Sequence, residues 1–88
     1  MLNMCGGGAQ PMTLAENLKT TRQKLLLTQE ELAKELNVSL STVNRWETGK
    51  ARPKLSTMKT IKLFCKIHNL PYGKIESGWL NYNAEDDK

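Results

Sequence analysis

The sequence has 88 residues, 39% of them hydrophobic and 6% aromatic, which allows one small domain and excludes a core large enough to enclose an active-site cleft. The net charge is +4, and the body is more basic, with twelve Lys or Arg against five Glu between residues 13 and 75. A basic body favours a polyanionic partner, although charge alone also fits a plain soluble surface. Two Cys, no signal peptide and no membrane-length apolar run predict a cytoplasmic protein without a membrane partner.

The two ends of the chain differ from its middle. Residues 1–12, MLNMCGGGAQPM, have no apolar periodicity and are predicted to form a flexible arm. Their Gly run lacks the following helix and Lys that a phosphate-binding loop needs. Residues 83–88 form an acidic tail that is predicted to be disordered. The folded domain is therefore expected over residues 13–82.

Thr13 and Glu16 have the spacing of a capping box, which predicts a first helix over residues 14–26. The inner face of this helix is formed by Leu14, Leu18, Thr21 and Leu25. Arg22 falls on the same face. Because an Arg on an apolar face usually has a partner, we expect Arg22 to pair with an acidic group.

Two short helices joined by a tight turn are predicted in the stretch TQEELAKELNVSLSTVNRWETG. Thr28 opens a second capping box for a helix over residues 29–36. Asn37 stands where the chain must reverse, and Asn tolerates a left-handed backbone well. Ser39 then caps a helix over residues 40–48.

The second of these helices has two unlike faces. Val43 and Trp46 form its apolar side. The opposite side carries Ser41, Asn44 and Arg45. A short helix that buries one side and offers Ser, Asn and Arg on the other suits the major groove of duplex DNA.

The whole stretch resembles the helix-turn-helix of phage repressors and Cro proteins, the lambda-repressor-like family. The resemblance covers residues 14–76 and departs from the family at Asn37, where Gly is usual. It implies a compact all-α domain of four or five helices that binds duplex DNA and regulates transcription, most often as a repressor. The residues that carry the resemblance are Gln29, Leu32, Ala33, Val38, Ser39, Val43, Trp46, Glu47, Gly49 and Pro53.

The resemblance also implies which residues face DNA. Arg45 is expected to read a guanine through two hydrogen bonds. Gln29, with the free N–H groups at the start of its helix, should hold a phosphate. Lys50 and Arg52 lie in a basic loop that should hold the DNA backbone, with a merely solubilising loop as the alternative. The full set of expected contacts is Gln29, Ser39, Leu40, Ser41, Asn44, Arg45, Lys50 and Arg52.

Two further expectations follow from the resemblance. In the family, the Arg matching Arg22 pairs with the Glu matching Glu47, so the same ion pair is expected here; the alternative is that each is solvated separately. Leu40 follows the cap of the recognition helix, where the fold exposes a side chain. It either contacts a thymine methyl group or folds back onto Val43 or Asn44.

Ser56 is predicted to cap a fourth helix that runs to His68 and whose core face holds Met58, Ile61, Phe64, Cys65 and His68. Cys65 is expected to be a small buried apolar group. A metal site or thiolate pair of Cys65 and His68 is disfavoured because the chain offers no further ligands. Without ligand clusters or nucleophile motifs, neither a cofactor nor enzymatic activity is expected.

The apolar residues left over from the core lie in the C-terminal third: Leu63, Ile67, Leu70, Trp79 and Tyr82. A fifth segment over residues 72–82 is expected to pack on the fourth helix, to form a dimer contact, or both. One short recognition helix reads only about four or five base pairs, so a weak homodimer on DNA is expected, with Leu63, Ile67 and Trp79 as its patch. The alternative is a monomer in which Trp79 covers Leu63 and Ile67.

Two other functions fit the same pattern. An antitoxin would bind its own promoter and, as its main partner, a toxin protein. A protein-interaction module would have lost DNA binding, but Arg45 and the basic loop are retained. Since 88 residues leave no room for a ligand-sensing domain, control is expected to come from a partner protein, from the protein's own concentration, or from a longer protein that includes this chain.

Overall fold

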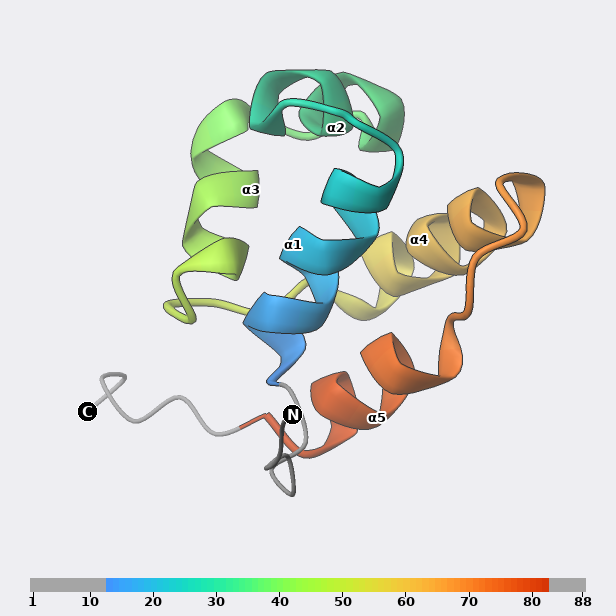
Figure 1. Cartoon of the computed structure of the whole chain (residues 1–88). Coiled ribbons are helices and arrows are strands. Elements are labelled where there is room, and N and C mark those ends of the chain that lie inside the picture. Colours follow the sequence, from blue (N-terminus) through green and yellow to red (C-terminus); the bar gives the residue numbers. More distant parts are fainter. Residues whose placement is uncertain (1–12, 83–88) are drawn as a thin grey trace, which may run out of the picture.

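The computed structural model describes residues 13–82, which form five helices and, within that span, no strand (Figure 1). The helices are α1 (Leu14–Lys24), α2 (Gln29–Leu36), α3 (Leu40–Glu47), α4 (Leu55–Ile67) and α5 (Gly73–Leu80). The predicted all-α architecture is confirmed. The predicted arm with Cys5 and the predicted acidic tail lie outside the described residues. None of the described helices is long and apolar enough to cross a bilayer.

The arrangement is built around α1, which packs against both α3 and α5 (Figure 1). The second helix, α2, packs against α3 and α4. The helix-turn-helix formed by α2 and α3 is therefore supported from behind by α1 and α4, which leaves the outer side of α3 uncovered.

Side-chain caps start α1 and α2 where the sequence predicts. Thr13 Oγ1 accepts a hydrogen bond from the Glu16 N–H at 3.2 Å, and the Glu16 carboxylate accepts one from the Thr13 N–H at 2.9 Å. Thr28 and Glu31 repeat this box at 3.0 and 2.8 Å. Asn37 ends α2 with φ 59° and ψ 47°, which confirms the left-handed turn.

Twelve apolar side chains from all five helices form one core: Leu14, Leu18, Leu32, Ala33, Leu36, Val43, Trp46, Met58, Ile61, Phe64, Cys65 and Ile75. The predicted inner faces of α2 and α3 are among them. Cys65 is fully buried, and burial raises the pKa of its thiol. Cys65 is therefore the small protonated apolar group that the sequence predicts.

Three predicted details of the helices are wrong. The first helix ends at Lys24 rather than at residue 26, because Leu26 takes a left-handed φ of 59° that turns the chain. The fourth helix begins at Leu55 without a side-chain cap, so Ser56 lies inside its first turn. The buried ring of Pro53 fixes the backbone just before that start. His68 is exposed beyond the end of α4, where its ring lies 4.5 Å from that of Phe64.

The fifth helix packs chiefly on α1, whereas the sequence predicted packing on the fourth helix, a dimer contact, or both. Asn17 of α1 is only 6% exposed, and its Nδ2 donates to the Lys74 carbonyl at 3.4 Å. Gly78 lies so close to α1 that an added Cβ would stand 3.0 Å from the Leu14 Cα and 3.1 Å from the Leu14 nitrogen. The absence of a side chain at Gly78 therefore sets how closely α5 approaches α1.

Replacing Gly78 by Ala should destabilise the fold even though Ala favours helix by about 0.5–1 kcal/mol. The added methyl group would meet the backbone of Leu14, which cannot rotate away. Overpacking of this kind costs about 1–3 kcal/mol, so we expect a net loss of about 1 kcal/mol in the free energy of unfolding, measured by urea denaturation. Gly73→Ala is the matched control, because nothing lies within 4 Å of its Cβ position. A Gly78→Ala protein as stable as Gly73→Ala would contradict this packing.

Candidate nucleic-acid interface

The outer face of α3 is the surface that the sequence assigns to DNA. Leu40, Ser41, Asn44 and Arg45 are exposed and share this face, because they follow at helical spacing. Val43 and Trp46 on the opposite side are 0% and 3% exposed. The recognition helix is thus anchored by its apolar side and presents one continuous polar surface, with Leu40 half exposed at its start.

Ser39 has a structural task at this surface. Its Oγ accepts a hydrogen bond from the Thr42 N–H at 3.1 Å and lies 2.7 Å from the Thr42 hydroxyl. This is the predicted cap, and it holds the first turn of α3 in place. The Ser39 hydroxyl is therefore already engaged within the protein, whereas no hydrogen bond within residues 13–82 engages the side chains of Ser41 or Arg45.

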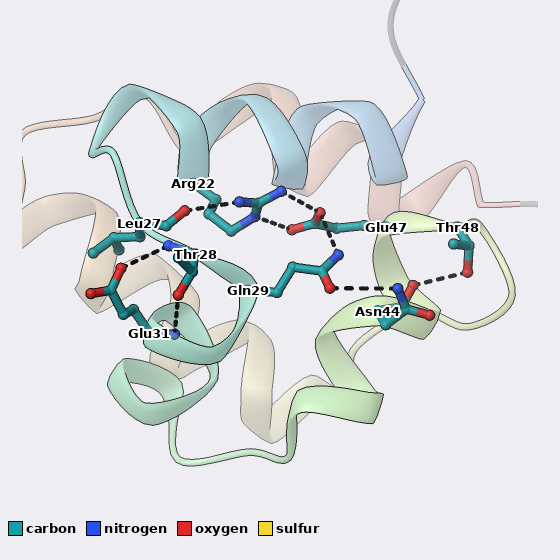
Figure 2. Close-up of polar contacts among 8 residues, drawn as sticks. All are labelled: Arg22, Leu27, Thr28, Gln29, Glu31, Asn44, Glu47 and Thr48. Atoms are coloured by element: carbon teal, nitrogen blue, oxygen red, sulfur yellow. Dashed lines mark hydrogen bonds and ion pairs between the residues drawn. The ribbon is translucent and has the colours of Figure 1, made fainter.

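Arg22 and Glu47 join α1 to the last residue of α3. Arg22 Nε and Nη2 donate to the two carboxylate oxygens of Glu47 at 2.7 and 2.9 Å. Its third nitrogen, Nη1, donates to the Leu27 carbonyl at 2.8 Å (Figure 2). The two side chains are only 13% and 3% exposed. The hydrogen bonds to Glu47 raise the pKa of Arg22, and burial opposes this only in part.

The same carboxylate also holds Gln29. Gln29 Nε2 donates to Glu47 Oε1 at 3.0 Å, and Asn44 Nδ2 donates to Gln29 Oε1 at 3.5 Å. Figure 2 shows the four side chains as one connected series that leads from the protein interior to the exposed face of α3. The sequence predicts separate DNA contacts for Gln29 and Asn44 but not the hydrogen bond between them. This hydrogen bond could be predicted only after the end of α3, with Glu47, was known to lie beside the start of α2, with Gln29.

The basic loop after α3 is fastened to the end of α5. Arg52 Nη1 donates to the Trp79 carbonyl at 2.8 Å, and the Arg52 guanidinium carbon lies 4.3 Å from the centre of the Trp79 ring. Trp79 Nε1 donates to the Pro53 carbonyl at 2.6 Å, and the Tyr82 hydroxyl donates to the Gly49 carbonyl at 3.1 Å. We call this set of contacts the loop clasp. The sequence predicts that Arg52 holds the DNA backbone, but it does not predict the loop clasp.

The three residues of the predicted dimer patch differ in exposure. Leu63 and Ile67 on α4 are 57% and 69% exposed, but Trp79 is half-buried in the loop clasp. The alternative in which Trp79 covers Leu63 and Ile67 is wrong, because both remain exposed. Trp79 packs against the loop after α3 instead, where the Pro53 carbonyl accepts from its N–H group and the Arg52 guanidinium lies over its ring.

Exposed positive charges accompany the recognition helix and the loop that follows it. Arg45, Lys50 and Lys54 are exposed at or just after the recognition helix, and Glu47, the acidic group of that helix, is neutralised by Arg22. Among the described residues, no group of three or more His, Cys, Asp or Glu is placed to hold a metal ion. The surface thus offers hydrogen-bond donors and positive charge to a polyanion.

Comparisons with known proteins point to the same region. A family model described as helix-turn-helix matches residues 18–67, more than half of the chain. The chain is 38% identical over 56 residues to an HTH-type transcriptional activator, BcrR, from Enterococcus faecalis. That match covers 64% of this chain, which spans only 28% of the relative's length. No solved structure matches the chain significantly.

Glu47→Ala should lower the free energy of unfolding by about 3–5 kcal/mol, because it leaves the buried Arg22 charge without its partner. Chemical denaturation measures the loss, and DNA binding should weaken indirectly, because Glu47 holds α3 and Gln29 rather than the DNA. Glu35→Ala removes an exposed carboxylate from α2 and should change stability by no more than about 0.5 kcal/mol. Equal stability of the two variants would show that the pair contributes nothing.

Proposed function

Because the chain belongs to the Cro/C1-type helix-turn-helix family, we propose that it binds duplex DNA through the exposed face of α3 and regulates transcription. The observation that carries this proposal is the division of α3 into a buried apolar side and an exposed face of Leu40, Ser41, Asn44 and Arg45. A helix of this size fits the major groove, where each base pair presents a distinct pattern of donors and acceptors. The name of the Enterococcus faecalis relative supports a role in transcription.

The contacts divide into those that read bases and those that position the protein. Arg45 reads a guanine, since its free guanidinium can donate to O6 and N7 together. Lys50 holds a phosphate beside the end of α3 and carries no sequence information. Arg52 contributes its charge to the same surface while the loop clasp fixes where the loop lies.

The mode of regulation that we propose is repression by occupancy. A compact domain seated in the major groove blocks a promoter without any further surface, whereas activation needs one that contacts the transcription machinery. A reporter gene whose promoter overlaps the bound site should be expressed less when this protein is present, and increased expression would count against repression.

We also propose that two copies bind one operator with two-fold symmetry. Leu63 and Ile67 supply an exposed apolar strip on α4, away from the recognition helix. Pairing would double the number of bases read, which a single eight-residue helix cannot achieve alone.

Selection of bound sites from random duplex DNA tests the function directly. We expect an enriched motif made of two half-sites in inverted repeat, about one helical turn or 34 Å apart. A motif with a single half-site would argue against the dimer but not against DNA binding. Failure to enrich any motif at low salt would overturn the proposed function itself.

Arg45→Ala should relax the preference at one base position and cost about 1–3 kcal/mol at that position. Lys50→Ala should weaken binding to every sequence alike and reduce the slope of log K against log salt by about one unit. Fluorescence anisotropy titrations at several salt concentrations measure both effects. If Arg45→Ala keeps the original preference, Arg45 is a phosphate ligand.

Leu40 should read a thymine, because its side chain is 49% exposed and the thymine methyl group is the apolar feature of the major groove. Uracil lacks only that methyl group. Replacing the thymine by uracil should therefore weaken binding of the unaltered protein and leave binding of Leu40→Ala unchanged. Equal weakening of both proteins would mean that Leu40 packs elsewhere.

A further inference from the structure

The hydrogen bonds around Glu47 have a fixed direction. A carboxylate accepts hydrogen bonds and donates none, so the amide of Gln29 must turn its NH2 group toward Glu47. The carbonyl oxygen of that amide then points the other way and accepts from Asn44 Nδ2. Each amide has two distinct ends, so one buried acceptor orients both of them in turn (Figure 2).

The carboxylate of Glu47, where this series of hydrogen bonds begins, can only accept. Glu47 is 3% exposed and is held by two hydrogen bonds from Arg22, whose guanidinium is always charged. Asn44, at the other end, is exposed on the α3 face. A free surface Asn rotates and can exchange its oxygen and nitrogen at little cost, whereas Asn44 is directed through Gln29.

We propose that Asn44 reads adenine, and that Gln29 acts as the positioning residue that holds its amide in the required orientation. The inference rests on the proposed DNA binding by α3. After one N–H of Asn44 is donated to Gln29, the second N–H and the oxygen Oδ1 remain side by side on the outer edge of the amide.

That outer edge matches one base better than the other three. Adenine presents an acceptor, N7, next to a donor, the N6 amino group, and an Asn amide satisfies both at once. Guanine presents two acceptors, thymine one acceptor and a methyl group, and cytosine a single donor. A fixed amide therefore discriminates for adenine, and it does so with little orientational entropy left to lose on binding.

A substitution at Gln29 can distinguish a residue that positions Asn44 from one that binds a phosphate. Gln29→Met keeps the length of the side chain but removes both hydrogen bonds. We expect binding to weaken about fivefold for sites with adenine at the position facing Asn44 and to stay unchanged for sites with another base there. The salt dependence should not change, because no phosphate contact is lost. Gln23→Met, at an exposed glutamine of α1, is the matched control and should bind all sites as before.

Two companion measurements complete the test. Asn44→Ala should lose the adenine preference, and adding Gln29→Met to it should cause no further change, since Gln29 acts through Asn44. Asn44→Asp keeps the oxygen and loses the N–H, so the preference should move from adenine to cytosine. This exposed substitution leaves the core intact, so it tests the proposal even if Gln29→Met proves unstable in a thermal melt.

The outcomes divide cleanly. A loss of binding by Gln29→Met that is equal for all four bases, with a smaller salt slope, would make Gln29 a phosphate ligand and overturn the inference while DNA binding stands. An unchanged adenine preference in Asn44→Asp would overturn it as well. Absence of specific binding by the unaltered protein would instead defeat the proposed function.

Discussion

The buried ion pair of Arg22 and Glu47 is the interaction on which the rest of the site depends. Glu47 is the last residue of α3, and its carboxylate lies almost wholly out of water against α1. A charge in that position is tolerated only when it is paired and hydrogen-bonded, and Arg22 and Gln29 together supply three donors to the carboxylate. The pair therefore sets the position of the recognition helix on the domain and makes that position expensive to change.

The ion pair also fixes the orientation of two side-chain amides that lead toward the surface. Apolar packing of Val43 and Trp46 fixes which side of α3 faces outward, but it has no preference for the direction of an amide. The carboxylate has such a preference, because it only accepts. Gln29 and Asn44 carry that preference over two side chains to the exposed face. A buried charge thus acts on an exposed surface without touching it.

The loop clasp secures the loop that follows the same helix. Arg52, Trp79 and Tyr82 tie the loop after α3 to the end of α5, which itself packs on α1 through Gly78. α1 therefore supports α3 directly through the ion pair and indirectly through α5. Both sets of contacts act at the C-terminal end of α3, the ion pair at Glu47 and the loop clasp along the short loop that carries Lys50.

The sequence by itself determined the elements and the core. Capping boxes, the left-handed Asn37 and the spacing of apolar residues are local or periodic features, so they could be predicted from neighbours along the chain. The resemblance to a known family added the expectation that Arg22 and Glu47 pair. Only the tertiary structure decided what Gln29, Arg52 and Trp79 contact, because their partners lie 15 to 27 residues away and each side chain has several chemically acceptable partners. Which of these it meets depends on how the helices pack, and that packing is settled by the whole core rather than by any one segment.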